Sequence, residues 1–202
     1  MSIQTKSQTL LKMNDKIKNI FIESIAVKQR IIQDRLLIAT IEQVSKVCIA
    51  ALRADKKILF CGNGGSAADA QHLAAEFSGR FYKDRDPLFA EALHVNTSYL
   101  TAVANDYSYD QIYSRLIKAK GREGDVLIGL STSGNSENIV KAFEQAKKQE
   151  MITVGMTGLL GGKMKKTSDY LLNVPSTDTP RIQESHITVG HIICELVELE
   201  LF

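Results

Sequence analysis

The sequence predicts an α/β protein in which a parallel sheet is flanked by helices and preceded by a helical N-terminal segment. From Lys57 onward, short apolar runs alternate with stretches of helical periodicity, the pattern of chains that form parallel sheets. The first 54 residues contain neither Gly nor Pro, and their apolar residues recur at helical spacing. We therefore expect a helical segment over residues 1–54 and an α/β domain over residues 55–202.

The N-terminal segment is predicted to form one long helix or a pair of helices that packs on the domain or on another subunit. Strands are predicted at residues 57–61, 88–95, 126–131, 152–157 and 170–174. Helices are predicted at residues 66–81, 98–105, 110–119, 136–149 and 180–201. The chain has no linker, internal repeat or low-complexity run, so it is expected to form a single structural domain.

The composition is that of an ordinary soluble protein. Of the 202 residues, 44% are hydrophobic and 24% are charged, and the net charge is +2. So small a charge, without a basic cluster, gives no case for nucleic acid or a membrane as a partner. The N-terminal residues lack the apolar core of a secretory signal. Cys48, Cys61 and Cys194 lie in apolar stretches, which favours buried thiols in a reducing compartment. A cytoplasmic location is therefore expected.

The turn after the first strand has the composition of an anion site. The residues GNGGS at positions 62–66 lead directly into a helix. Backbone N–H groups, a hydroxyl and the positive end of a helix dipole would meet there, which suits a phosphate. The same helix carries His72 and Glu76, which are four residues apart and so lie on one face. Two simpler interpretations stay open: glycines that only turn the chain, and a His–Glu pair that is only solvated.

A second turn, STSGNS at residues 131–136, also joins a strand to a helix. Its four hydroxyls exceed the one that a helix N-cap requires, so this turn is predicted to bind an anion through neutral donors. Because parallel strands end at one edge of the sheet, both turns should face the same ligand. The C-terminal helix adds Gln183 and His191, eight residues apart and close to one face. A lone His on an apolar helix is more often a core residue than a catalyst.

Four stretches together carry a resemblance to a known family. They are CGNGGSAADAQHLAAEFSGRF, AVANDYSYD, GREGDVLIGLSTSGNSENIVKA and DTPRIQESHITVGHIICELVE, in this order. The chain resembles the sugar isomerase (SIS) family, and within it the phosphoheptose isomerases, over nearly its whole length. The resemblance implies the flavodoxin-like, three-layer SIS fold with five parallel strands, and a homotetramer with active sites at subunit interfaces. It also implies an aldose–ketose isomerase that converts sedoheptulose 7-phosphate into D-glycero-D-manno-heptose 7-phosphate for lipopolysaccharide or capsule synthesis.

The site residues follow from the resemblance by position. Glu76 matches the family's catalytic glutamate and His191 its catalytic histidine. The positions that match substrate contacts are Asn63, Gly64, Gly65, Ser66, Arg80, Asn105, Asp106, Ser131, Thr132, Ser133, Ser136 and Gln183. In some members a zinc ion lies between the positions matching His72, Glu76, Gln183 and His191, so one Zn²⁺ per subunit is the expected cofactor. Moving a carbonyl between adjacent carbons needs a base for a carbon-bound proton and an acid near the oxygens, and a carboxylate and an imidazole supply both.

Two other functions stay open. One is isomerisation of a different phosphosugar, such as a hexulose or pentulose phosphate. The other is a non-catalytic SIS scaffold that binds the replication initiator, although that relative lacks residues matching Glu76 and His191. Substrate preference is left open by three departures from the family pattern: the triplet His94-Val95-Asn96, Pro180 in place of an aspartate, and Glu91 in an expected apolar strand.

Overall fold

The computed structural model describes residues 3–202, with side chains from Lys12 onward. Its strands form one parallel sheet in the order β2-β1-β3-β4-β5. They are β1 (Ile58–Gly62), β2 (Ala90–Ala92), β3 (Val126–Ser131), β4 (Ile152–Thr157) and β5 (Tyr170–Asn173). This order is that of flavodoxin-like folds, which bind ligands where the order reverses, here between β1 and β3. The predicted α/β fold with a five-stranded parallel sheet is confirmed.

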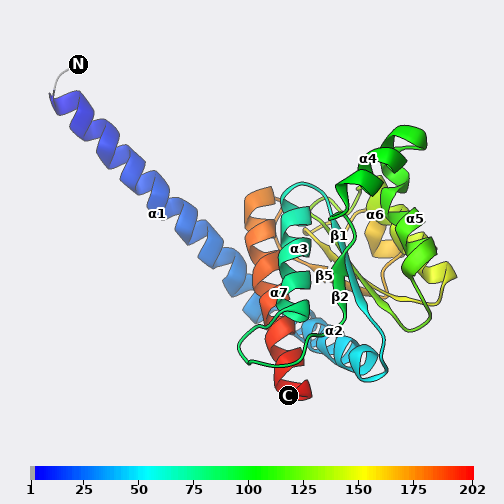
Figure 1. Cartoon of the computed structure of the whole chain (residues 1–202). Coiled ribbons are helices and arrows are strands. Elements are labelled where there is room, and N and C mark those ends of the chain that lie inside the picture. The colour runs from blue at the N-terminus through cyan, green and yellow to red at the C-terminus, as the bar shows by residue number, and fades with distance from the viewer. Residues whose placement is uncertain (1–2) are drawn as a thin grey trace.

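Helices cover both faces of this sheet (Figure 1). One face is packed by α2 (Arg35–Arg53), α3 (Gly65–Ser78) and α7 (Thr179–Leu201). The other is packed by α4 (Thr97–Asp106), α5 (Ile112–Lys120) and α6 (Glu137–Lys148). Residues of β1 alternate between the two cores: Ile58 and Phe60 join the first, Leu59 and Cys61 the second. Strands buried on both faces in this way need the near-continuous apolar runs that the sequence shows.

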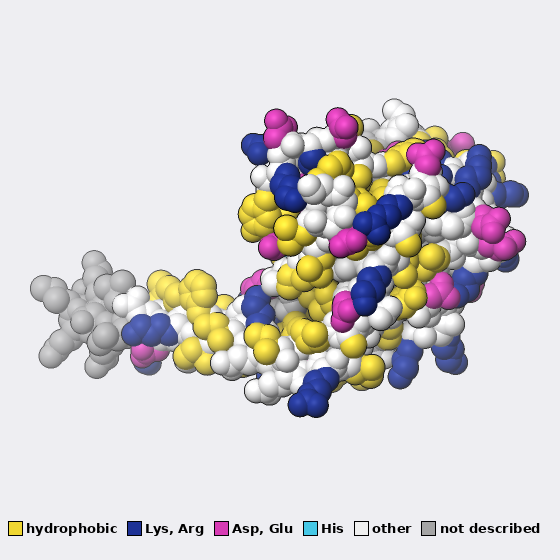
Figure 2. Space-filling model, turned by 90° about the horizontal axis from the view of Figure 1, so that it is seen from below, with side chains coloured by type: hydrophobic (Ala, Val, Ile, Leu, Met, Phe, Trp, Pro, Cys, Tyr) yellow, Lys and Arg dark blue, Asp and Glu magenta, His cyan; other side chains and the backbone are white. Residues whose placement is uncertain are grey.

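The N-terminal segment is a pair of helices, one of the two predicted forms. Helix α1 (Ile3–Gln33) leaves the body as a long arm (Figure 1). Asp34 ends it and caps α2, since its carboxylate accepts from the backbone N–H groups of Leu36 and Leu37 at 3.0 Å. Between residues 13 and 25, α1 carries exposed hydrophobic side chains, and hydrophobic side chains gather along the arm in Figure 2. They include Met13, Ile17, Ile20, Phe21, Ile22 and Ile25. Contiguous apolar surface of this kind marks an interaction site.

Some predicted boundaries are wrong. The strand predicted at 88–95 is reduced to β2, an edge strand that pairs only with β1. Glu91 is tolerated there because it is half-exposed and forms an ion pair with Lys120 of α5. The helix predicted to reach residue 81 ends at Ser78, before Gly79. Short 3₁₀ helices at Tyr109–Gln111 and Lys163–Lys166 were not predicted. Across the residues that the structure describes, no helix combines the length and apolar character needed to cross a bilayer.

Helices α3 and α7 lie against each other because one residue at their contact has no side chain. A Cβ placed on Gly190 would come within 2.5 Å of Leu73. Leu73 follows His72, and Gly190 precedes His191. The same contact therefore sets the distance between these two histidines.

Replacing this glycine tests the contact. Gly190→Val should lower the free energy of unfolding by about 2 kcal/mol, because the added carbons overpack Leu73. Leu73→Ala alone should cost about 2–5 kcal/mol through the cavity it leaves. The double variant conserves volume, so denaturant unfolding should show it to be more stable than the sum of the two losses predicts. If the two losses of unfolding free energy simply add in the double variant, a direct contact between Leu73 and Gly190 is contradicted.

Candidate active site

The turn after β1 depends on glycine. Gly64 has φ +56° and ψ −124°, a conformation that L side chains rarely adopt. The hydroxyl of Tyr113 donates to the carbonyl of Gly62 and fixes the start of the turn. Ser66 is buried in the first turn of α3, and its backbone N–H donates to the carbonyl of Asn63 at 3.1 Å. The turn thus delivers the N-terminus of α3, with its positive dipole, to the carboxyl edge of the sheet.

The turn after β3 concentrates hydroxyls at the same edge. The Oγ of Ser131 lies 3.0 Å from the Oγ of Ser136 and 3.5 Å from the Oγ of Ser133. Ser136 is the N-cap residue of α6, yet its side chain makes no capping hydrogen bond. Thr132 and Ser133 line a cleft of about 230 Å³. The hydroxyls of Ser131, Ser133 and Ser136 therefore lie close to one another beside this cleft, and the simpler interpretation of Ser136 as a cap does not account for them.

A pair of amides joins the two turns. Asn63 and Asn138 exchange two hydrogen bonds, each 2.9 Å long, and the hydroxyl of Tyr109 also donates to Asn63 at 3.2 Å. Asn138 is buried at the start of α6. The two turns thus lie side by side, and their spacing is fixed. Asn138 was not among the residues predicted from the sequence, although its place just after the second turn was a usable signal.

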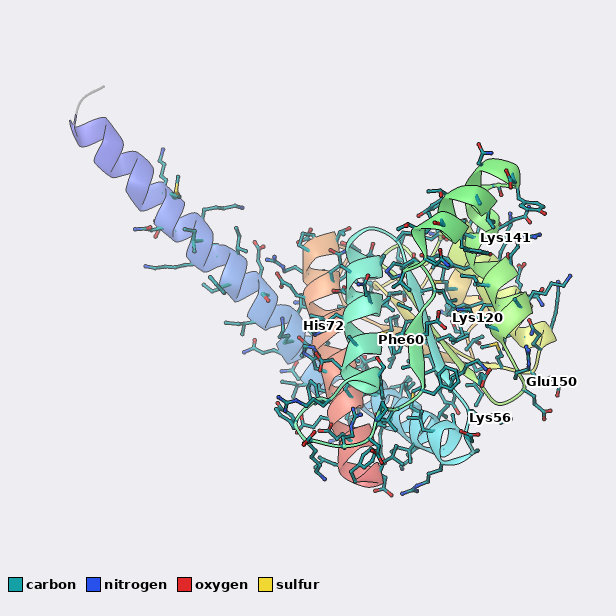
Figure 3. The ribbon with its side chains drawn as sticks, viewed as in Figure 1. Lys56, Phe60, His72, Lys120, Lys141 and Glu150 are labelled. Carbon is teal, nitrogen blue, oxygen red and sulfur yellow. The ribbon has the colours of Figure 1, made fainter. Side chains whose placement is uncertain are left out.

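The titratable residues meet farther along α3. The Nε2 atoms of His72 and His191 are 2.9 Å apart, and His72 Nε2 lies 3.3 Å from an oxygen of Glu76. Figure 3 shows His72 on the side of α3 that faces α7. The side chain of His72 is 49% exposed and that of Glu76 22%. The structure therefore brings together one carboxylate and two imidazoles, with solvent access on one side.

This cluster fits a metal ion. Its ligand atoms all lie within 4.8 Å of one another. Ligands at about 2.0–2.1 Å around a tetrahedral zinc are roughly 3.3 Å apart, close to the two distances from His72 given above. Among the described side chains, His72, Glu76 and His191 form a three-donor set, which suits a zinc site that keeps a position open.

Asp69, one turn before His72, was also missed by the sequence analysis. Its Oδ2 is buried and has no hydrogen-bond partner among the described residues. Burial raises the pKa of the Asp69 carboxyl, while the charges of His72 and His191 act against that rise. Its spacing of three residues from His72 places it on the same face of α3 and was the signal that could have identified it.

The other selected residues lie apart from this cluster. Gln183 packs against Gly65, where a Cβ would come within 2.7 Å of its amide. Arg80 is exposed in the loop after α3. Asn105 and Asp106 are exposed at the end of α4, where the amide of Asn105 donates to the carboxylate of Asp106 at 3.0 Å. The chain by itself therefore presents two groups, the anion turns with Gln183 and the His–Glu cluster.

Comparison with known proteins defines the class. The SIS domain family matches residues 21–158. The phosphoheptose isomerase of Aneurinibacillus thermoaerophilus is 55% identical over 190 residues, which are 94% of this chain and 96% of that protein. Among solved structures, the phosphoheptose isomerase of Neisseria gonorrhoeae has a TM-score of 0.87 at 43% identity, covering 93% of this chain and 99% of that chain. The phosphoheptose isomerase of Francisella tularensis has a TM-score of 0.88 at 36% identity, covering 93% and 98%.

The fold and these matches make the chain a SIS-domain protein. Within that class, the chain belongs to the phosphoheptose isomerases, which are aldose–ketose isomerases.

The anion turns can be tested directly. Ser131→Ala combined with Ser133→Ala should weaken the binding of inorganic phosphate and of substrate together, because the two hydroxyls are neighbours in the turn and Ser133 lines the cleft. Isothermal titration measures both affinities. Thr40→Ala, which removes a hydroxyl from α2, is the control and should bind like the wild type. A folded double variant with unchanged affinity for both ligands would contradict this placement.

Proposed function

We propose that the chain converts sedoheptulose 7-phosphate into D-glycero-D-manno-heptose 7-phosphate in the cytoplasm, for the heptose of lipopolysaccharide or capsule. The observation that carries this proposal is the combination of the cluster His72, Glu76 and His191 with an anion turn at the start of the same helix. The choice of a heptose phosphate as substrate rests on the relatives, which are named phosphoheptose isomerases and are 52–55% identical over about 94% of the chain. A scaffold has no need for a carboxylate and an imidazole in contact.

The residues of the chain support a proton transfer through an enediolate. Glu76 takes a proton from C1 of the ketose, and the electron pair of that C–H bond forms the C1–C2 double bond. His191 protonates the carbonyl oxygen at C2. Return of a proton to C2 and loss of the hydroxyl proton at C1 then give the aldose. Positioned acid–base groups contribute about 10²–10⁴-fold, so holding the phosphate and orienting the two carbons must supply the rest.

We propose zinc as the cofactor, one ion per subunit, held by His72, Glu76 and His191. When bound, it would supply positive charge beside the oxygens on which negative charge develops. The residues themselves orient the substrate and move the protons. The close approach of the two imidazoles requires that they share a hydrogen atom or a cation, because two bare nitrogen lone pairs would repel.

We also propose that the active site is completed in a homotetramer. Gln183 stays the proposed fourth ligand; in its own chain it lies against Gly65, seven residues and hence about 10 Å along α3 from His72. We propose that contacts between subunits bring Gln183 to the ion. The exposed apolar face of α1, in the segment of residues 1–54, is the surface that we assign to the assembly.

Turnover measurements separate the candidate functions. Purified protein should isomerise sedoheptulose 7-phosphate with a kcat/KM at least about tenfold above that for hexulose or pentulose phosphates. Preference for one of these shorter phosphosugars would replace the heptose assignment and keep the mechanism. Absence of turnover on every phosphosugar, with the fold intact, would favour a scaffold.

Removing the proposed base should abolish turnover and preserve binding. Glu76→Gln keeps the shape of the side chain but cannot accept a carbon-bound proton, so kcat should fall at least 10²-fold. Calorimetric titration should still detect the substrate. Glu42→Gln, at an exposed position on α2, should retain wild-type turnover. More than about a tenth of the wild-type kcat in Glu76→Gln would remove Glu76 as the base.

The metal site is tested by one histidine change and its control. His72→Ala should abolish zinc uptake, measured by elemental analysis, because the ion would lose one of its three ligands. His94→Ala changes a histidine outside the cluster and should still take up zinc. Chelation of the wild type should lower its melting temperature through linkage, since the unfolded chain has no such site. Metal-free protein with full turnover and an unchanged melting temperature would exclude the ion.

A further inference from the structure

A buried carboxylate anchors the loop that follows α3. Glu198, near the end of α7, is 2% exposed. It accepts hydrogen bonds from three consecutive backbone N–H groups: Phe81 at 3.2 Å, Tyr82 at 2.8 Å and Lys83 at 2.8 Å. Burial raises the pKa of the Glu198 carboxyl, but these donors and Arg85 outweigh it and hold the pKa below its usual range. Glu198 is therefore charged, and it fixes the backbone of this loop.

Arg85 carries this anchor to the end of α3. Its Nε donates to Glu198 at 2.9 Å, and its side chain is 3% exposed. Its Nη2 donates to the carbonyl of Glu76 and its Nη1 to that of Phe77, both at 2.9 Å. Carbonyls in the last turn of a helix lack partners within the helix, and a cation there also interacts with the helix dipole. One guanidinium thus joins α7 to the turn of α3 that carries Glu76.

The same loop also reaches His191. The ring centre of Phe81 lies 5.6 Å from that of His191, with 39° between the planes. His191 and Glu198 are seven residues apart on α7 and therefore share a face. Glu198 fixes the backbone of Phe81, so it determines where this ring lies beside the imidazole.

We propose that Glu198 and Arg85 are positioning residues for the active site. We call them the loop clamp. The clamp holds the backbone of Glu76 from one side and, through Phe81, the ring of His191 from the other. This inference rests on the proposed function, because it assigns the clamp to the acid–base and metal cluster. Catalytic and metal-binding groups act efficiently only when they are held within about 0.5 Å of the productive geometry.

One variant loosens the clamp, and a second removes the ring that the clamp positions. Arg85→Lys keeps the charge near Glu198, but a single ammonium group cannot reproduce the fork that also bonds two carbonyls of α3. Phe81→Leu keeps an apolar contact and removes the ring. Phe81→Tyr keeps the ring and should behave like the wild type. Arg53→Lys is the matched control, because Arg53 pairs with Glu200, two residues from Glu198, but at the surface.

The measurements are zinc affinity by chelator competition, kcat and KM on sedoheptulose 7-phosphate, and affinity for inorganic phosphate. Arg85→Lys and Phe81→Leu should each weaken zinc binding and lower kcat by about tenfold or more, as changes behind metal ligands do. KM and phosphate affinity should stay at wild-type values, since the anion turns lie at the other end of α3. Phe81→Tyr and Arg53→Lys should match the wild type in every measurement.

The outcomes separate this inference from the proposed function. If the wild type neither isomerises the sugar nor binds zinc, the proposed function and the clamp inference are both wrong. If the wild type does both, and Arg85→Lys and Phe81→Leu match it, only the clamp inference falls. Parallel losses of phosphate affinity, kcat and melting temperature would assign the clamp a purely structural role and would also overturn the inference.

Discussion

The packing of α3 on α7 is the constraint on which the site depends. The two helices are joined at three points along their length: Gln183 contacts Gly65, Leu73 contacts Gly190, and Arg85 of the following loop bridges Glu198 to the last turn of α3. The first contact lies at the anion turns, the second beside the two histidines and the third at the loop after α3. Because the contact at Gly190 has no room for a side chain, the helices lie close enough for the rings of His72 and His191 to meet. One helix pair therefore carries both groups of candidate residues, from the anion turns to the His–Glu cluster.

The turns proposed to bind an anion carry little charge of their own. The turn at residues 131–136 contains no Lys or Arg. Lys163 donates its backbone N–H to Asn135 in that turn, and its ammonium group pairs with Glu137 at 2.9 Å. Hydroxyls, N–H groups and the dipoles of α3 and α6 remain as the donors. The proposed site would bind a phosphate through neutral donors, so a net charge of +2 is compatible with a phosphorylated ligand.

The sequence predicted what depends on local pattern. The strands at 126–131 and 152–157 have the predicted bounds, because buried strands are continuous apolar runs. The turns and the pairing of His72 with Glu76 are equally local. Contacts between segments far apart in the sequence were not predicted. The clamp joins residues 85 and 198, and the amide pair joins residues 63 and 138. The predicted end of α3 at residue 81 failed for the same reason, since N–H groups of residues 81–83 bind Glu198 instead of continuing the helix.

The fold contains a second buried carboxylate, Asp125, and comparing it with Glu198 clarifies the role of Glu198. Asp125 accepts from the backbone N–H groups of Lys57 and Arg122 and pairs with the ammonium group of Lys57 at 2.5 Å. A buried ion pair alone is weak evidence for stability. Each of these two carboxylates, however, accepts several hydrogen bonds that offset the cost of its burial. Their positions differ. Asp125 joins the amino ends of β1 and β3, the edge of a parallel sheet that faces away from ligands. Glu198 instead binds the loop after α3, in which Arg85 bonds to the carbonyl of Glu76 and the ring of Phe81 lies beside His191. The same chemistry therefore fastens the sheet in one place and positions the proposed catalytic groups in the other.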